Sequence, residues 1–138
     1  MGGCASQAVL IGRPPFRLSY MASPQPDDVL GGMATKLTIG VCAFNEERNI
    51  RALLDDILGQ RGLPADTKVI VVASGCTDRT PDIVRELVAK DQRVRLVEEG
   101  TRTGKTRAIN EILRRCRSEL LALVDADIRL PPDCIGEV

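Results

Sequence analysis

The 138-residue sequence contains no histidine or tryptophan, and only two phenylalanines and one tyrosine. Without histidine, the common zinc sites lose their usual nitrogen ligand, and no two cysteines have the Cys-x-x-Cys spacing. Few aromatic rings are available to stack on RNA bases. Lysine plus arginine and aspartate plus glutamate each number 19, so no excess positive charge attracts nucleic acid. These absences argue against a zinc fold and against nucleic acid as a partner.

Long apolar runs and an even set of cysteines are also missing. No run of 18 apolar residues occurs, so the sequence offers no membrane-spanning helix. The five cysteines are scattered at positions 4, 42, 76, 116 and 134. Such usage is typical of a reducing compartment. We therefore expect a cytoplasmic protein, which could be held at the cytoplasmic face of a membrane only by a part of the protein beyond this chain.

Residues 1–35 differ in composition from the rest of the chain. Pro14, Pro15, Pro24 and Pro26 interrupt this stretch, and it shows no helical or strand period. We expect residues 1–35 to be a disordered leader. Residues 36–138 then form one folded domain or part of one.

From residue 36 onward, apolar runs alternate with amphipathic stretches. The runs typical of buried strands are 37–43, 68–73, 94–97 and 119–124. Between them, apolar residues recur at helical spacing, and Asn45 is a favourable N-cap for the first helix. Right-handed crossovers between such strands give a parallel sheet. The sequence predicts an α/β, Rossmann-like fold with a mainly parallel sheet and flanking helices.

Two carboxylates, Asp125 and Asp127, follow the last apolar run. Parallel sheets bind ligands at the carboxyl ends of their strands. Residues i and i+2 of an extended chain point the same way, so these side chains can converge on one cation. Paired carboxylates suit Mg²⁺ or Mn²⁺ shared with substrate phosphates. The plainer alternative is a strand end with two solvated acids.

A second phosphate-binding pattern is nearly present at residues 100–106. A P-loop needs four residues between its glycines so that successive backbone N–H groups wrap the phosphates. Only three residues separate Gly100 from Gly104. A P-loop-like nucleoside-triphosphate hydrolase is therefore a weaker alternative.

Four motifs in this order resemble the family 2 glycosyltransferases of the GT-A fold. They are residues 39–47 with Ile50, residues 71–80, Gly104 and Lys105 with Ala108 and Asn110, and residues 125–127. The resemblance runs from about Lys36 to Pro132. It implies a nucleotide-diphospho-sugar transferase that moves a sugar from a UDP- or GDP-sugar to an unknown acceptor with inversion. It also implies Mn²⁺ or Mg²⁺ as cofactor.

The resemblance assigns roles to particular positions. The residues that it implies for the donor nucleotide are Ala43, Phe44, Glu46, Ser74, Lys105 and Asp125. Asp125 would face the ribose or the metal, and Asp127 would bind the metal that bridges the diphosphate. A departing nucleoside diphosphate develops negative charge, which a bound cation stabilises. Glu46 and Lys105 also have a plainer interpretation, as residues that begin helices.

The sequence departs from the family pattern in two places. Many members have an acid pair where this chain has Ala73 and Ser74, so Ser74 offers a hydroxyl without a charge. The chain also ends eleven residues after Asp127, whereas in the family the acceptor-binding half and the catalytic base lie further on. An inverting transfer needs such a base. We therefore expect a truncated chain that holds the donor-binding half, with the base beyond Val138 and no transfer by the isolated chain. The alternative is a non-catalytic sugar-nucleotide-binding or interaction module.

Overall fold

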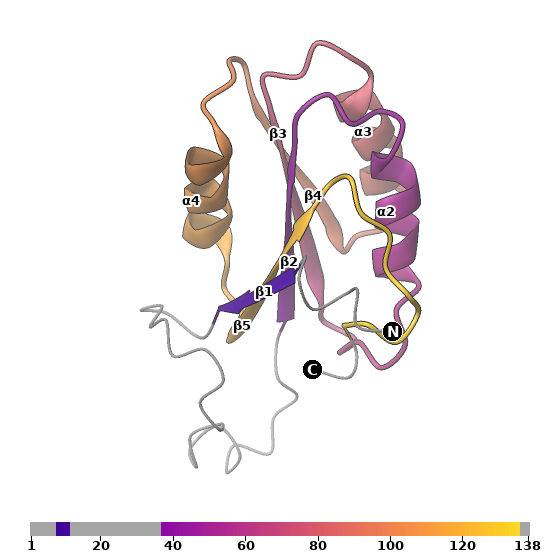
Figure 1. Ribbon diagram of the computed structural model, residues 1–138. Coiled ribbons are helices and arrows are strands. Elements are labelled where there is room, and N and C mark those ends of the chain that lie inside the picture. The colour runs from indigo at the N-terminus through magenta and orange to yellow at the C-terminus, as the bar shows by residue number, and fades with distance from the viewer. Residues whose placement is uncertain (1–7, 12–36, 136–138) are drawn as a thin grey trace.

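The computed structural model describes residues 8–11 and 37–135 (Figure 1). Its strands are β1 (Ala8–Ile11), β2 (Leu37–Ala43), β3 (Lys68–Ser74), β4 (Val94–Glu99) and β5 (Leu120–Asp125). Its helices are α2 (Ile50–Leu58), α3 (Thr80–Lys90) and α4 (Lys105–Arg115). In this part of the chain, no helix has the length and apolar character that crossing a bilayer requires.

The sheet has the strand order β1-β5-β2-β3-β4. β5, β2, β3 and β4 are parallel, and β1 is antiparallel to β5. The chain runs outward from β2 through β3 to β4 and then returns to the other side of β2 as β5 (Figure 1). The order of the strands therefore reverses between β2 and β5. The predicted α/β fold with a mainly parallel sheet and flanking helices is confirmed.

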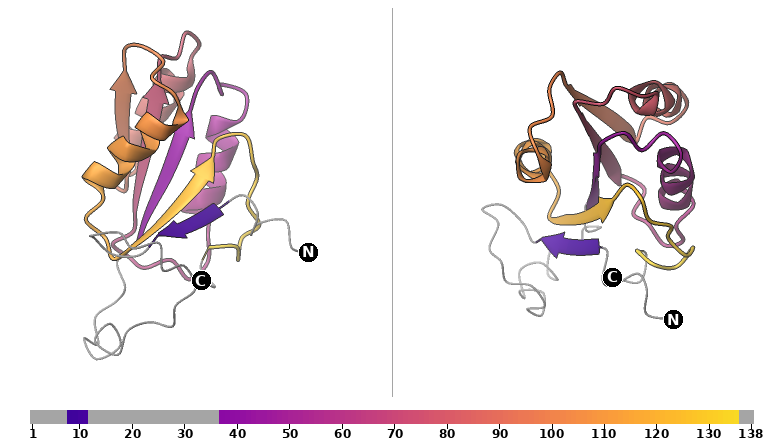
Figure 2. Two further views of the ribbon diagram at one scale, coloured as in Figure 1. Left: turned by 60° about the vertical axis from the view of Figure 1, so that its left-hand side comes forward. Right: turned by 45° about the horizontal axis from the view of Figure 1, so that its top comes forward.

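Helices cover both faces of the sheet, with α2 and α3 on one face and α4 on the other (Figure 2). Alternate residues of each strand enter the two cores. On β3, Val69 and Val71 belong to the cluster under α2 and α3, whereas Ile70 and Val72 belong to the cluster under α4. Burial on both faces explains why these strands read as continuous apolar runs in the sequence.

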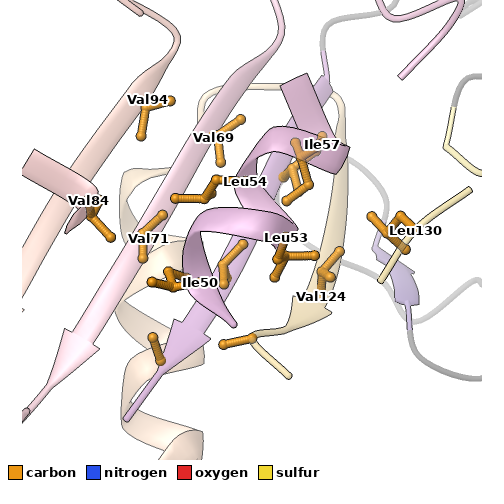
Figure 3. Packing of buried hydrophobic residues seen from close by; sticks show 14 of the residues in the cluster. Ile50, Leu53, Leu54, Ile57, Val69, Val71, Val84, Val94, Val124 and Leu130 are labelled. Atoms are coloured by element: carbon orange, nitrogen blue, oxygen red, sulfur yellow. The ribbon is translucent and has the colours of Figure 1, made fainter. Parts of the chain in front are cut away.

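The larger core lies between α2 and the sheet (Figure 3). Ile50, Leu53, Leu54 and Ile57 of α2 are fully buried there. Their spacing places them on one face of the helix, as the sequence predicts. On the opposite face of the sheet, a Cβ at Gly40 would lie 2.6 Å from Ile112 Cγ2. A glycine on β2 thus allows α4 to pack close to the strand.

After β5 the described chain turns back along α2 (Figure 1). Leu130 and Ile135 are buried in the core under α2. The Arg61 backbone N–H just after that helix donates a hydrogen bond to the Pro132 carbonyl at 2.8 Å. Residues 126–135 therefore complete the cover of this core.

The structure differs from the expected disordered leader at Ala8–Ile11. These residues form β1, in register with β5 from Ala8 opposite Val124 to Ile11 opposite Leu121. The backbone groups on that side of β5 would otherwise be unpaired, and an unpaired edge is a template for another strand. The pairing joins segments far apart in the sequence, so the local composition of residues 1–35 could not predict it. The other residues of the expected leader lie outside the described part of the chain.

Candidate functional site

A pocket of about 350 Å³ opens at the carboxyl ends of β2, β3 and β5. It lies where the order of strands reverses, which is where open α/β sheets bind ligands. All seven residues named from the sequence line it: Ala43, Phe44, Glu46, Ser74, Lys105, Asp125 and Asp127. Five others line it as well: Cys42, Arg102, Gly104, Ala108 and Ala126. The fold therefore brings the predicted site residues together from three strand ends and the start of α4.

Lys105 and Asp125 form an ion pair in this pocket. Lys105 Nζ lies 2.6 Å from Asp125 Oδ1. The hydrogen bond to Asp125 raises the pKa of Lys105, and the negative charge of Asp127 acts in the same direction, outweighing the effect of burial. Two carboxylates thus already attract one cationic group at this point of the pocket.

The same two carboxylates are the candidates for a metal site. Across residues 8–11 and 37–135, no group of three or more aspartate, glutamate, cysteine or histidine side chains is placed to hold a metal. Asp125 and Asp127 would thus supply the protein ligands, leaving other coordination positions to water and phosphate oxygens. Hard oxygen donors of this kind suit Mg²⁺ and Mn²⁺. The residues present fit a divalent cation.

The loop after β2 takes its shape from a side-chain contact with the loop after β3. Asn45 has a positive φ of 50°, in the left-handed region. Its Oδ1 accepts a hydrogen bond from the Thr77 backbone N–H at 2.8 Å. The predicted helix cap at Asn45 is therefore wrong, because α2 begins at Ile50, with Asn49 as its N-cap. Asn45 instead ties the loop that carries Phe44 to the neighbouring loop.

Asp78 adds one more tie between these loops and holds Thr80, which adds another. Its Oδ1 accepts hydrogen bonds from the Thr80 backbone N–H at 2.9 Å and from the Thr80 hydroxyl at 2.6 Å. Its Oδ2 accepts one from the Glu47 backbone N–H at 3.1 Å. Burial alone would raise the pKa of Asp78, but the hydrogen bonds from Thr80 and Glu47 outweigh it and lower the pKa. The Thr80 oxygen also accepts a bond from the Glu46 backbone N–H at 2.9 Å.

Ser74 forms part of the pocket wall and holds the loop between β4 and α4. Its oxygen accepts a hydrogen bond from the Thr103 backbone N–H at 3.1 Å. The Thr103 hydroxyl donates to Glu99 Oε2 at 2.6 Å. Burial would raise the pKa of Glu99, but the hydrogen bonds from Thr103 and Ser74 outweigh it and lower the pKa. The Ser74 hydroxyl is thus already engaged within the protein.

Arg102 is the pocket residue that sequence reasoning missed and that has the clearest contact. Its Cζ lies 4.0 Å from the centre of the Phe44 ring. Phe44 is large and apolar, and 36% of it is exposed. Gly75 lets the Arg102 backbone pack closely against the loop after β3. Gly75 has a φ of +60°, and a Cβ there would collide with the Arg102 backbone nitrogen. An aromatic ring beside a guanidinium plane is a surface on which a nucleobase can stack.

Cys42 lies beside the ion pair, directly opposite Asp125 in the sheet register. Burial raises the pKa of this thiol to about 11, although the positive charge of Lys105 opposes the shift. The thiol is therefore neutral at ordinary pH and is a poor nucleophile. Cys42 acts as a small side chain in the wall of the pocket.

Comparison with known proteins identifies the fold and the family. Residues 38–138 match the family model described as Glycosyl transferase family 2. Glycosyltransferase AglD of Haloferax volcanii is 32% identical over 98 residues, which cover 67% of this chain and 15% of that protein. Dolichyl-phosphate beta-glucosyltransferase ALG5C of Trichomonas vaginalis is 28% identical over 127 residues, covering 82% of this chain and 38% of that protein.

A solved structure agrees with these matches. The mannosyltransferase PcManGT from Pyrobaculum calidifontis, in complex with GDP-Man and Mn²⁺, has a TM-score of 0.67 and 32% identity. The match covers 83% of this chain and 32% of that chain. The present chain thus spans well under half the length of each of these three proteins. Because the family model spans almost all of the folded part, the chain belongs to glycosyl transferase family 2.

Proposed function

We propose that the pocket binds a nucleotide-diphosphate sugar, either a UDP- or a GDP-sugar, and that the whole protein transfers the sugar to an acceptor with inversion. One observation carries this proposal: the pocket at the reversal of strand order combines Asp125, Asp127 and Lys105 with an exposed phenylalanine. The two aspartates suit a metal ion, Lys105 suits the negatively charged diphosphate, and the phenylalanine ring suits the nucleobase of such a donor. The GDP-Man and Mn²⁺ bound by PcManGT support it.

Particular side chains of the pocket would bind particular parts of the donor. Phe44 and Ala43 would line the nucleoside, and the Lys105 ammonium would lie against the diphosphate. Asp125 and Asp127 would hold Mn²⁺ or Mg²⁺. When bound, that cation supplies positive charge that stabilises the departing nucleoside diphosphate.

Inverting transfer is a single displacement at the anomeric carbon. The acceptor oxygen forms the new bond to that carbon as the bond to the diphosphate oxygen breaks. The electron pair leaves with the nucleoside diphosphate, and a general base takes the proton of the acceptor hydroxyl. We propose that this base belongs to the longer protein, beyond Val138. The residues of this chain therefore bind and orient the donor.

For the location of the protein, we propose the cytoplasm, at the cytoplasmic face of a membrane. Cys42, Cys76 and Cys116 are free thiols, as is usual in a reducing compartment, whereas Cys134 is disulfide-bonded. The name of ALG5C states a lipid-linked phosphate, dolichyl phosphate. An acceptor of that kind would bring the longer protein to a membrane surface.

The proposal is tested by calorimetry with the full 138-residue chain. UDP and GDP are titrated with and without Mn²⁺, into the parent protein and into Asp127→Asn. We expect metal-dependent binding that the variant loses. Asp66→Asn is the matched control, because Asp66 is exposed at the opposite end of the sheet, just before β3.

Other results would favour the alternatives. A folded chain that binds neither nucleotide would support the interaction module. Nucleotide binding that ignores Mn²⁺ would support a non-catalytic binding module. ATP binding that survives Asp127→Asn would support the P-loop alternative, which the family match already disfavours.

A further inference from the structure

Asp56 on α2 holds the chain just after the two pocket carboxylates. Its Oδ2 accepts hydrogen bonds from Arg129 Nε at 2.6 Å and from the Leu130 backbone N–H at 3.0 Å. Its Oδ1 accepts a third from Arg129 Nη2 at 3.1 Å. The Asp56 side chain is only 16% exposed. A two-point contact to arginine combined with a backbone bond fixes geometry better than a simple surface ion pair does.

This contact lies close to Asp127 along the chain. On one side, Asp125 is anchored in the sheet opposite Cys42. On the other side, Arg129 and Leu130 are anchored to α2 by Asp56. Asp127 lies midway between these anchors, so few backbone arrangements remain open to it.

Burial in this segment alternates in a way that favours one orientation. Ala126 and Leu130 are buried, and Ile128 packs against the same core. Asp127 and Arg129 are exposed. Apolar residues facing the core therefore hold the intervening side chains outward. The hydrogen bonds to Asp56 fix the position of residues 126–130 along the axis of α2.

We propose that Asp56 is a positioning residue that sets the backbone from which Asp127 reaches a divalent cation in the pocket. This inference rests on the proposed function of the pocket. Asp56 itself touches neither the donor nor the cation. Groups that hydrogen-bond directly to metal ligands commonly alter metal affinity when they are changed, and Asp56 would act through the backbone two residues from Asp127.

A second tie keeps the segment attached when Asp56 is altered. Gln60 Nε2 donates to the Pro131 carbonyl at 2.5 Å, and the Ile135 backbone N–H donates to Gln60 Oε1 at 2.8 Å. This tie lies further from Asp127 along the chain. Gln60→Ala is therefore a matched control that weakens attachment of the same segment without releasing Arg129.

The experiment compares Asp56→Asn, Gln60→Ala and Asp55→Asn with the parent chain. Asp55 is exposed beside Asp56, so Asp55→Asn removes a charge near Arg129 without removing these bonds. For each protein, the affinity for UDP and GDP is measured with and without Mn²⁺. Thermal unfolding of each protein reports its stability.

We expect Asp56→Asn to weaken only the Mn²⁺-dependent part of nucleotide affinity, by about tenfold. Binding without Mn²⁺ should be unchanged. Gln60→Ala should lower the unfolding temperature and retain the metal dependence, and Asp55→Asn should match the parent chain.

Two results would overturn the positioning role. One is an Asp56→Asn protein with the metal dependence of the parent. The other is an equal loss in Asp56→Asn and Gln60→Ala, which would mean that attachment of the segment is all that matters. The parent chain tests the proposed function separately, because it alone decides whether binding depends on metal.

Discussion

Lys105 Nζ lies 2.6 Å from Asp125 Oδ1, so the first residue of α4 is paired with the last residue of β5. Both side chains remain accessible, with 63% and 39% of their surfaces exposed. Such an exposed pair contributes little to folding, because water screens it. We expect the pair to matter for binding instead, because in the proposed donor site the two charges would neutralise each other before the donor arrives.

Replacing Lys105 with methionine should therefore have opposite effects on two ligands. Mn²⁺ alone should bind more tightly, because Asp125 loses its competing cation. UDP and GDP should bind about tenfold more weakly, because a bond to a charged phosphate is lost. Calorimetry measures both affinities. Lys68→Met is the control, because Lys68 is exposed at the far end of β3; equal affinities in Lys105→Met and the parent would contradict this role.

The contact between Arg102 and Phe44 predicts that stacking of the nucleobase contributes to the affinity for UDP and GDP. Phe44→Ala should weaken UDP and GDP by about tenfold, since stacking on an aromatic ring contributes about 1–3 kcal/mol per base. Pyrophosphate, which lacks a base, should bind Phe44→Ala and the parent equally. Arg102→Lys keeps the charge but loses the planar group, so it should weaken the nucleotides more than pyrophosphate. Arg95→Lys is the control, because Arg95 is exposed on β4; it should change the affinity for neither the nucleotides nor pyrophosphate. If Phe44→Ala weakened UDP, GDP and pyrophosphate equally, that result would argue against stacking.

The tight packing of α4 against Gly40 predicts that a larger residue at this position destabilises the fold. A Cβ there would lie 2.6 Å from Ile112 Cγ2 and 3.1 Å from Leu123 Cδ2. Gly40→Ala should lower the free energy of unfolding by about 1–3 kcal/mol, because neighbouring side chains must leave their rotamers. Urea unfolding measures the change. In Gly100→Ala, where no atom lies within 4 Å of the new Cβ, stability should change little; an equal loss in both variants would contradict the packing argument.

Asp78 predicts a dependence of stability on pH. Because its folded pKa is lowered, the ionised carboxylate stabilises the fold above the pKa of the unfolded chain, and this contribution is lost as the pH falls through the folded pKa. Asp78→Asn should therefore reduce the free energy of unfolding by about 1 kcal/mol at pH 7. The difference from the parent should begin to shrink as the pH falls below about 3.9, the ordinary pKa of an aspartate, and should continue to shrink through the lower folded pKa. Urea unfolding across this range measures it, and a difference that is constant with pH would show that the charge plays no part.

Much of the fold could be predicted from local sequence. Apolar runs and helical spacing marked the four parallel strands and the three helices, because burial imposes a short period on neighbouring residues. The sequence also located Asp125 and Asp127 correctly at a strand end. The match to the known family confirms the family resemblance read from the motifs.

Errors arose where a residue's partner lies far away in the sequence. Asn45 has the chemistry of a helix cap, but its side chain bonds to Thr77 in the next loop. Ala8–Ile11 belong to a stretch that reads as a disordered leader, and yet their backbone pairs with β5. In both cases, a contact between distant segments outweighed a local preference.

Local sequence specified the four parallel strands, the helices between them and the chemical groups carried to the ends of those strands. Tertiary packing determines which side chains meet: Lys105 with Asp125, Arg102 with Phe44, and Asp56 with Arg129. Burial selects apolar residues at a regular spacing along one segment, so it can be read locally, whereas contacts between loops depend on how crossovers and packed helices bring separate segments together.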